Sequence, residues 1–383
     1  MNWRQSYLRL APEAALKRLE IPYIYHTGRD ELYEIDDRAL DFLTRCDGRA
    51  KGEILTDDAE FVEYCIEEGI LEAFSAPAPL DISVAHSPYP SLRYLELHLT
   101  HRCNLKCRHC YLGEPRPAEL ALSDAVDITR QFSEMGGLRL LVSGGEPMVY
   151  QKLASYLEAV RDLKIRRILF TNGTRITTEN IKWLDVDEIQ FSLDGWRAGH
   201  DWLRGPGVFE KTVNGVNIAR KAGIPVSFST MIHKGNLTEF DRMREFMAEV
   251  EALEWGIDIL TEAGALEGHA DITVPYEQAA PLMAYAYGGG YHGASEGYAC
   301  GRHLMAVMPD GKAVKCGFYR DWPLGDARKS FKDCWLNMTH IRLDELECRD
   351  CPVLEECRGG CRFRASHPLA PDPAMCRLYG IER

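Results

Sequence analysis

The stretch Cys103-Asn104-Leu105-Lys106-Cys107-Arg108-His109-Cys110 places three cysteines on one short loop with CX3CX2C spacing. It directly follows an apolar run that ends near Leu99 and is typical of a β-strand. Three thiolates on such a loop can hold three irons of a 4Fe-4S cluster and leave the fourth iron open to a substrate. A zinc site, with His101 or His109 as a further ligand, is the alternative.

The chain from Leu92 to about residue 260 alternates short apolar strands with helical segments. The pattern predicts six strand ends, near Leu99, Val142, Phe170, Leu193, Met231 and Ile259. Six such units favour an α/β fold, a partial (β/α)6 barrel of the TIM type. Loops after the strands of a parallel barrel converge on one mouth, so the active site is expected there.

Three further polar motifs follow these predicted strand ends: Ser143-Gly144-Gly145-Glu146-Pro147, Phe170-Thr171-Asn172-Gly173 and Phe191-Ser192-Leu193-Asp194-Gly195. Two glycines let the backbone approach a ligand closely, and the Glu146 carboxylate can accept a hydrogen bond from an ammonium group. The other two motifs offer hydroxyls, an amide and a carboxylate. Ordinary turn chemistry is the alternative, because Asn-Gly and Asp-Gly are favoured in turns.

In this order, the motifs resemble those of the radical S-adenosylmethionine (SAM) superfamily. The resemblance implies that Cys103, Cys107 and Cys110 are catalytic and hold a 4Fe-4S cluster whose open iron chelates SAM. Reductive cleavage of SAM would then give a 5′-deoxyadenosyl radical. The resemblance also implies that SAM is contacted by His109, Ser143, Gly144, Gly145, Glu146, Thr171, Asn172, Ser192 and Asp194, with His109 near the adenine and Glu146 near the methionine amino group.

The composition narrows the class of protein and its compartment. The 383 residues are 45% hydrophobic and 27% charged, which is typical of a globular protein of two or three domains. A formal charge of −13 argues against nucleic acid as a partner. No run of about 18 apolar residues occurs, and residues 1–6 lack the apolar stretch of a signal peptide. A cytoplasmic location without membrane contact is therefore expected, and the thirteen cysteines are expected to bind metal or do chemistry.

Residues 1–88 form a distinct acidic segment with a net charge of −9, whereas the remainder carries −4. Strands are predicted at 21–26 and 31–35, followed by a helix capped by Asp36 or Asp37 and a second helix at 60–68. Residues 1–74 resemble the PqqD-like peptide-recognition domain, a winged-helix-like α+β fold. The resemblance implies that a leader peptide adds a strand to a sheet edge. A plain winged-helix appendage is the alternative. Cys46 and Cys65 are predicted to be buried.

The last hundred residues carry a second cysteine pattern, which comprises Cys300, Cys316, Cys348, Cys351, Cys357, Cys361 and Cys376. A hairpin turn is predicted at 309–312. The pattern resembles the seven-cysteine SPASM module, with zinc as the alternative. The resemblance implies two auxiliary iron-sulfur clusters, an outer one on Cys348, Cys351, Cys357 and Cys376 and an inner one on Cys300, Cys316 and Cys361.

The inner set lacks one ligand that many relatives supply. No cysteine follows Cys300 closely, so the inner cluster is expected to have an open iron unless Cys334, which the pattern favours as a core residue, completes it. Sulfatase-activating relatives carry an Asp directly after the second SPASM cysteine. Gly317 stands at this position, which argues against seryl or cysteinyl oxidation.

These interpretations together predict three domains: a PqqD-like domain with linker at 1–88, a radical SAM barrel at 89–275 and a SPASM domain at 276–383. The expected function is maturation of a ribosomally made precursor peptide by an oxidative modification such as a crosslink. The expected partners are the precursor peptide, bound through its leader, and a flavodoxin- or ferredoxin-type reductant. The alternative is a radical SAM enzyme acting on a small-molecule precursor of the heme pathway.

Overall fold

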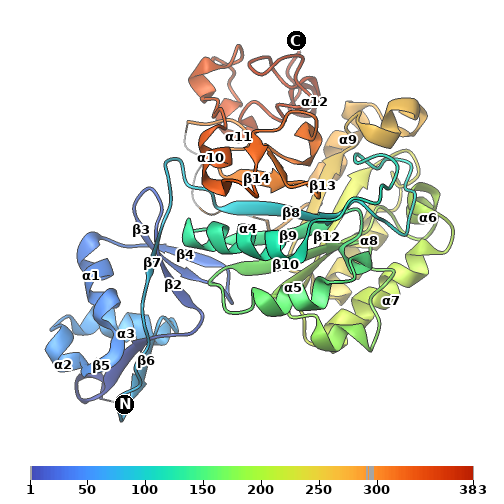
Figure 1. The fold of residues 1–383 in the computed structure, drawn as a ribbon. Helices are drawn as coiled ribbons and strands as arrows, with labels where there is room; N and C mark the ends of the chain where they lie inside the picture. Colours follow the sequence, from blue (N-terminus) through green and yellow to red (C-terminus); the bar gives the residue numbers. More distant parts are fainter. Residues whose placement is uncertain (1, 290–291, 293–296, 383) are drawn as a thin grey trace. The chain divides into compact units, whose positions relative to one another are not determined.

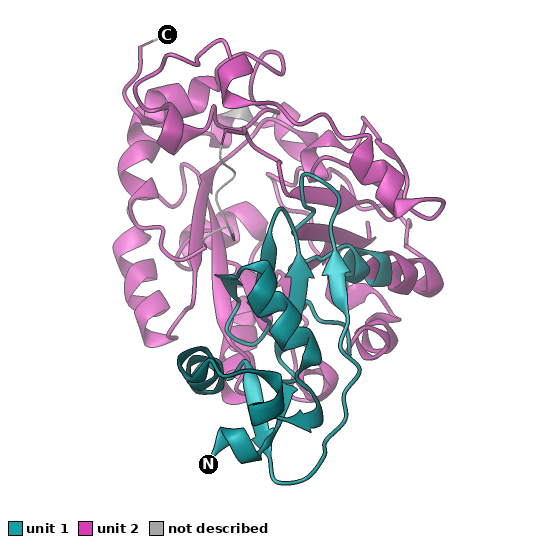
Figure 2. Cartoon of the chain, turned by 90° about the vertical axis from the view of Figure 1, so that its left-hand side faces the viewer, with its two compact units in different colours: residues 1–93, 130–139, 162–166 teal, residues 94–129, 140–161, 167–383 magenta. Residues whose placement is uncertain are grey.

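The computed structural model describes residues 2–289, 292 and 297–382. The chain forms two compact units (Figure 2). Unit 1 comprises residues 1–93, 130–139 and 162–166, and unit 2 comprises residues 94–129, 140–161 and 167–383.

Unit 1 contains two small sheets. In one, β1 (Tyr7–Leu10) lies between β5 (Asp47–Lys51) and β6 (Leu71–Phe74), antiparallel to both. In the other, β2 (Ala14–Arg18), β3 (Pro22–His26) and β4 (Glu31–Glu34) form an antiparallel meander, and β7 (Val84–His86) pairs parallel to β2. The predicted hairpin is confirmed as β3 and β4. The alternation that predicted it is absent from β2, whose first four residues are all buried.

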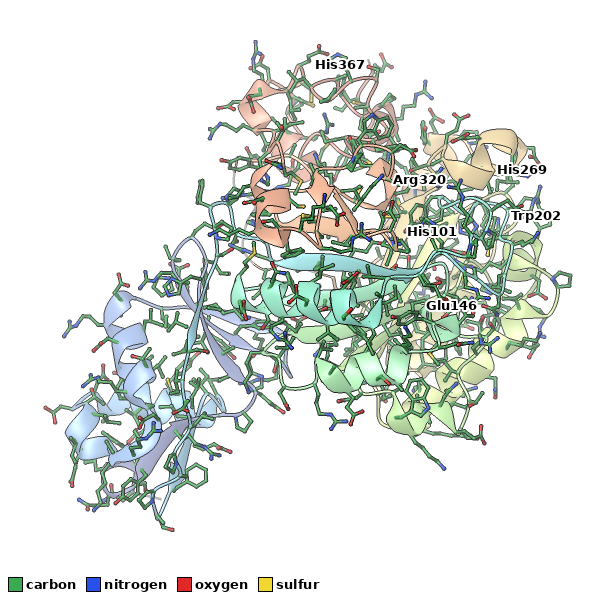
Figure 3. All side chains as sticks on the ribbon, in the orientation of Figure 1. His101, Glu146, Trp202, His269, Arg320 and His367 are labelled. Atoms are coloured by element: carbon green, nitrogen blue, oxygen red, sulfur yellow. The ribbon has the colours of Figure 1, made fainter. Side chains whose placement is uncertain are left out.

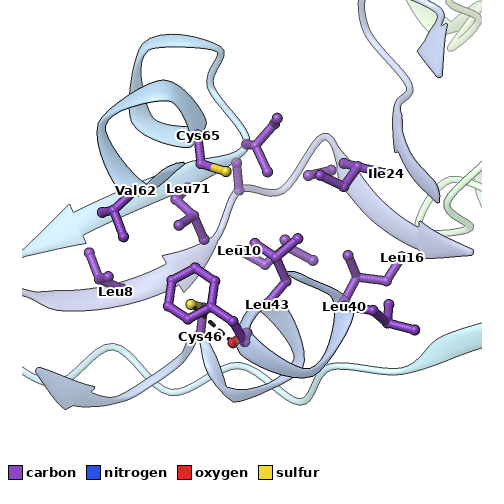
Figure 4. Close-up of a cluster of buried hydrophobic side chains, with 14 of the residues drawn as sticks. Leu8, Leu10, Leu16, Ile24, Leu40, Leu43, Cys46, Val62, Cys65 and Leu71 are labelled. Atoms are coloured by element: carbon purple, nitrogen blue, oxygen red, sulfur yellow. Dashed lines mark hydrogen bonds between the residues drawn. The ribbon is translucent and has the colours of Figure 1, made fainter. Parts of the chain in front are cut away.

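The helices of unit 1 are α1 (Asp37–Arg45), α2 (Gly52–Leu55) and α3 (Ala59–Glu67), with a 3-10 turn η1 (Trp3–Gln5). Asp36 caps α1, because its side chain accepts a hydrogen bond from the Ala39 amide at 2.7 Å. The apolar faces of α1 and α3 pack on the strands around Leu8 and Leu43 (Figure 4). Cys46 and Cys65 are fully buried in this core, as predicted.

Unit 2 is built on one long sheet, in which the six predicted barrel strands are all present. They are β8 (Tyr94–Thr100), β9 (Arg139–Gly144), β10 (Arg166–Thr171), β11 (Glu188–Ser192), β12 (Val226–Ile232) and β13 (Trp255–Ile259). The strands follow one another in chain order across the sheet, and β10 to β13 pair in parallel. The predicted α/β partial barrel is therefore confirmed.

Helices between the strands lie along the outer face of the sheet (Figure 1). They are α4 (Leu122–Glu134), α5 (Leu153–Ala159), α6 (Ala198–Arg204), α7 (Val208–Lys221) and α8 (Phe240–Glu249), with 3-10 turns η2 (Pro147–Val149) and η3 (Asn180–Trp183). Phe209, Val216, Met243 and Phe246 point inward from α7 and α8 and are buried. Within the described residues, no helix has the length and apolar character needed to cross a bilayer.

The C-terminal part extends the same sheet, which was not predicted. Strand β14 (Leu304–Val307) pairs parallel to β8, β15 (Lys312–Val314) returns antiparallel after the predicted turn, and β16 (Gly325–Asp326) pairs with β15. The remaining elements are short: α9 (Tyr276–Met283), α10 (Phe331–Leu336), α11 (Leu354–Cys357), α12 (Pro373–Leu378) and the 3-10 turns η4 (Gly264–Gly268), η5 (Ala270–Ile272), η6 (Gly317–Tyr319) and η7 (Leu343–Glu345).

Candidate active site

The CX3CX2C loop leaves the sheet at the end of β8, with its three cysteines half-buried. The glycine motif at the end of β9 is hydrogen-bonded to the end of β8 and to this loop. The Gly145 amide donates to the Thr100 carbonyl at 2.7 Å, and the Glu146 amide donates to the Arg102 carbonyl at 3.0 Å. A Cβ on Gly145 would lie only 2.4 Å from the Arg102 carbonyl oxygen. Glycine is therefore required here for close contact with the cysteine loop itself.

The thiols of the cysteine loop need a nearby positive charge if they are to ionise and bind metal. Burial raises the pKa of Cys103 to about 12. Burial also raises the pKa of Cys107, but the positive charge of Arg204 opposes this increase. Because the thiolate is the form that binds metal, a nearby cation favours ligation.

Arg204, at the end of α6, supplies that cation and was not singled out from the sequence. Its Nη1 lies 3.9 Å from Cys107 Sγ, and its Nε donates to the Asp194 carboxylate. The other Asp194 oxygen accepts from the Met231 amide at 2.7 Å. Although burial opposes ionisation, Arg204 and the neighbouring His109 hold the pKa of Asp194 well below its usual range. Asp194 thus positions Arg204 against the cysteine loop.

His109 has one ring nitrogen free for a ligand. Its Nε2 lies 3.8 Å from an Asp194 oxygen, whereas its buried Nδ1 has no hydrogen-bond partner among the described residues. Burial lowers the pKa of His109 to about 4, so the ring is neutral at physiological pH. An unsatisfied buried nitrogen is costly unless a bound group completes it, and the adenine of SAM is a group of suitable chemistry. The residues therefore fit the implied cofactor.

Glu146 connects the ends of two strands. Its carboxylate is buried and accepts hydrogen bonds from Thr171 Oγ1 at 2.7 Å, the Asn172 amide at 2.8 Å and the Met148 amide at 3.0 Å. The Asn172 side chain in turn donates to Asn104 Oδ1 on the cysteine loop at 3.1 Å. In Figure 3, Glu146 and His101 lie near the same end of the sheet. Burial raises the pKa of Glu146, and these hydrogen bonds oppose the increase.

The serines of two motifs lie at or next to the ends of their strands. Ser143 lies in β9, with its Oγ 3.4 Å from Glu96 Oε1, and Ser192 is the half-buried last residue of β11. Gly144, which also belongs to β9, has a φ of +134°, and a Cβ there would meet the Thr100 carbonyl oxygen at 2.4 Å. The structure thus brings the SAM-motif residues predicted from the sequence to one end of the barrel.

A partly buried carboxylate inside β8 is the second group that the motifs did not reveal. Glu96 Oε1 lies 2.8 Å from His98 Nε2 and 3.4 Å from the Tyr111 hydroxyl, which donates to it. Although burial opposes it, His98 lowers the pKa of Glu96. The only sequence signal was a polar residue within an apolar strand.

Tyr111, directly after the third cysteine, explains why residue 317 is glycine. A Cβ on Gly317 would lie 2.7 Å from the Tyr111 ring and 2.9 Å from its hydroxyl. Phe318 packs against the same ring with centroids 4.9 Å apart. The position occupied by Asp in sulfatase-activating relatives is therefore sterically closed here by Tyr111.

The C-terminal cysteines fall into two sets. Burial raises the pKa of Cys316 to about 12, with contributions from the nearby thiols of Cys300 and Cys361. Lys315 lies among these three thiols, and burial lowers its pKa against their negative charge. Cys334 is instead buried in α10 beside Gly325.

The second set gathers around Cys357. Burial raises the pKa of this thiol, and the thiols of Cys376 and Cys348 contribute further. The amide of Cys351 donates to the Cys348 carbonyl at 2.9 Å, so the turn keeps Cys351 beside this set. Among the described residues, no three His, Cys, Asp or Glu side chains are arranged to hold a single metal ion.

A cysteine loop after the first strand of a parallel partial barrel, with polar residues from later strands converging on it, defines a class of enzyme that can hold a cluster and a ligand at the barrel mouth. Residues 97–247 match the model of the radical SAM superfamily. The chain therefore contains a radical SAM domain at residues 97–247 and is an enzyme.

Curated relatives of the chain include enzymes with different substrates. An AdoMet-dependent heme synthase of Nitratidesulfovibrio vulgaris is 24% identical over 327 residues, which is 72% of this chain and 89% of the relative. A PqqA peptide cyclase of Gluconobacter oxydans is 25% identical over 323 residues, covering 73% of this chain and 87% of the relative.

A solved structure resembles nearly the whole chain. SuiB of Streptococcus suis, crystallised with the precursor peptide SuiA, superposes with a TM-score of 0.72 and 18% identity. The similarity covers 97% of this chain and 100% of SuiB. At this identity the likeness concerns the fold.

Proposed function

We propose that this chain is a radical SAM peptide maturase, which abstracts a hydrogen atom from a ribosomally made precursor peptide and installs a crosslink or another oxidative modification. The observation that carries the proposal is unit 1. It has its own hydrophobic core, and it is part of the fold shared with SuiB, which was crystallised with the precursor peptide SuiA. The alignments with the heme synthase and the PqqA peptide cyclase cover 72% and 73% of the chain, so coverage alone does not separate the two kinds of substrate.

Strand β4 of unit 1 is the proposed leader-binding edge. It is the outermost strand of its sheet, and no described strand pairs with its outer side. An extended peptide can add to such an edge through backbone hydrogen bonds. Tyr33 of β4 contacts Tyr64 of α3 edge-to-face at 6.5 Å, and Tyr64 is 45% exposed. These two rings offer apolar contacts beside the edge. The net charge of −9 over residues 1–88 favours a neutral or basic leader.

The barrel would hold the cofactors at its mouth. Cys103, Cys107 and Cys110 are the proposed cluster ligands, and His109 is the proposed contact of the adenine. When bound, the 4Fe-4S cluster and SAM supply the electron and the 5′-deoxyadenosyl radical. The protein's own part is to keep the ligands in place through Glu146 and to keep Arg204 against Cys107 through Asp194.

Two auxiliary clusters are proposed for the C-terminal part. The proximity of the Cys300, Cys316 and Cys361 thiols supports an inner site, and the proximity of Cys348, Cys357 and Cys376, with Cys351 adjacent, supports an outer site. The division into domains at 1–88, 89–275 and 276–383 follows the same three tasks: leader binding, SAM cleavage and electron transfer.

Mass spectrometry tests the function. A candidate peptide encoded beside the gene is incubated with the reconstituted enzyme, SAM and a reductant. A mass loss of the peptide that depends on SAM is expected. Tyr33→Ala and Tyr64→Ala should weaken peptide binding but leave the dithionite-driven cleavage of SAM without peptide unchanged. Equal peptide binding by both variants and the wild type would argue against the β4 edge.

A second candidate function is modification of a heme precursor, which the 24% identity to the heme synthase over 327 residues favours. Incubation with an iron-porphyrin carboxylic acid under the same conditions distinguishes the two. SAM-dependent conversion of the porphyrin, together with no binding of any candidate peptide to unit 1, would favour this second function.

A further inference from the structure

We propose that the surface around Cys103 is the docking site of a small acidic one-electron carrier protein. The inference rests on the proposed cluster at Cys103, Cys107 and Cys110, because that cluster needs an electron for each SAM cleaved. It adds the location of electron entry and the residues that receive the partner.

An open cavity of about 390 Å³ lies beside the cysteine loop. Two arginines and no carboxylate line it, and Cys103 forms part of its wall. Its lining residues are Arg102, Cys103, Asn104, Met148, Val149, Gln151 and Arg175. A proposed cluster ligand thus borders a cavity that is open to solvent. Because the rate of electron transfer falls steeply with distance, a carrier seated here would be placed favourably.

The charge of this surface is opposite to that of the chain. The chain carries −13, but the loop at 101–116 holds Arg102, Lys106, Arg108 and Arg116 and one carboxylate, Glu114. Arg108 is already paired with Asp271 at 3.1 Å, so Arg102, Lys106, Arg116 and the neighbouring Arg175 are the cations of this surface. A basic patch on an acidic protein selects acidic partners, because the rest of its surface repels them.

The cations of the patch can exchange their present carboxylate partners for carboxylates of a carrier protein. Arg102 lies 3.5 Å from Glu119, and Lys106 lies 3.4 Å from Glu114, with both members of the second pair about four-fifths exposed. Such exposed pairs contribute little to stability, so their replacement by carboxylates of a partner costs little. Arg175 is exposed, and within the described residues its guanidinium has no ion-pair partner, whereas its carbonyl accepts from Asn180 Nδ2 at 2.7 Å.

The half-buried Met148 and Val149 give the patch a small apolar centre within its basic rim. Weak electron-transfer complexes have small interfaces and depend on charge for their association. A nucleic acid would need a larger positive surface than one loop of a chain with −13 charges provides. The observations therefore favour an acidic carrier protein.

The electron balance of the step is simple. A flavodoxin hydroquinone anion gives up one electron and becomes the neutral semiquinone, and the oxidised cluster accepts that electron. No bond is made or broken at the docking surface. One electron is consumed for each SAM converted to methionine and the 5′-deoxyadenosyl radical, which without substrate takes a hydrogen atom from a buffer component.

The test compares two reductants on the reconstituted holoenzyme under anaerobic conditions. The rate of 5′-deoxyadenosine formation is measured with a purified acidic flavodoxin hydroquinone and with dithionite, which needs no docking site. For Arg175→Glu, the flavodoxin-driven rate at low salt should fall by about tenfold and lose most of its salt dependence. The dithionite-driven rate should not change. Lys332→Glu, an identical charge change at an exposed residue of α10, should affect neither rate.

Three results would overturn the inference. Equal flavodoxin-driven rates in Arg175→Glu and the wild type would exclude the surface. A parallel fall with both reductants would mean that Arg175 serves SAM or the cluster. Binding of an oligonucleotide that depends on Arg175 and displaces flavodoxin would assign the patch to nucleic acid. Calorimetric binding of oxidised flavodoxin to the wild type and the variants tests the surface even if dithionite drives no SAM cleavage, an outcome that would count against the radical SAM assignment instead.

Discussion

The Nη1 of Arg204 lies 3.9 Å from the Sγ of Cys107, although the two residues are 97 positions apart. The contact depends on α6, whose Leu203 carbonyl accepts a hydrogen bond from the Arg108 amide at 3.0 Å. A buried cation beside a cysteine favours its thiolate form, which is the form that binds iron. The end of α6 is therefore built as part of the cysteine loop's environment.

Arg204→Gln should destabilise the protein strongly. The substitution leaves the Asp194 carboxylate buried without its cation, and loss of one partner of such a pair costs about 3–5 kcal/mol. Denaturant unfolding of the protein measures the change. In the double variant Arg204→Gln/Asp194→Asn, the loss should be smaller than the sum of the two single losses, and strict additivity would show that the pair is not coupled.

Cys107→Ser should lower the iron content by about four atoms per chain and abolish SAM cleavage with dithionite, because a 4Fe-4S cluster on three thiolates does not tolerate loss of one. Iron analysis and 5′-deoxyadenosine formation check this. The matched control is Cys65→Ala in the core of unit 1, which should retain the full iron content. Retention of iron in Cys107→Ser would contradict the ligand assignment.

Gly317→Asp should disturb the inner cysteine set and not create a new base. Its Cβ would lie 2.7 Å from the Tyr111 ring, so either the ring or the η6 turn that follows Cys316 must move. We expect the variant to contain less iron and to show weaker visible absorbance from its iron-sulfur clusters. The double variant Gly317→Asp/Tyr111→Ala should regain part of the iron, and an unchanged single variant would show that the contact is not restrictive.

The buried Lys17 should make the stability of unit 1 depend on pH. This side chain is fully buried, its Nζ donates to the carbonyls of Gly137 at 2.6 Å and Lys164 at 2.8 Å, and burial lowers its pKa to about 7. Between pH 7 and 10.5 the unfolded chain binds a proton that the folded unit does not. Stability should therefore rise with pH in this range, by up to about 1.4 kcal/mol per pH unit. Thermal unfolding at several pH values measures the slope, and Lys17→Met should flatten it. A wild-type slope of zero would contradict the lowered pKa.

Local patterns were sufficient for the barrel strands and for the motif residues. The alternation of short apolar runs with helical segments predicted β8 to β13. A turn motif predicted the β14–β15 hairpin, and Asp36 was one of two predicted caps of α1. Each of these depends on neighbours within a few residues. The short strand β2 was missed because its burial on both faces removes the alternation that marks a strand. Strand β1 was also missed, although its burial alternates.

The sequence by itself identified the residues that are proposed to carry the chemistry: the CX3CX2C loop, the polar ends of the parallel strands and the C-terminal cysteines, because spacing along the chain encodes them. Only the tertiary structure decided what surrounds them. The pairing of Arg204 with Asp194 beside Cys107, the contact of Tyr111 with Glu96 and Gly317, and the addition of β14 to β8 all join segments whose separation in sequence carries no information about their distance in space. Packing of the strands and helices sets those distances, and the charges and hydrogen bonds of the site follow from them.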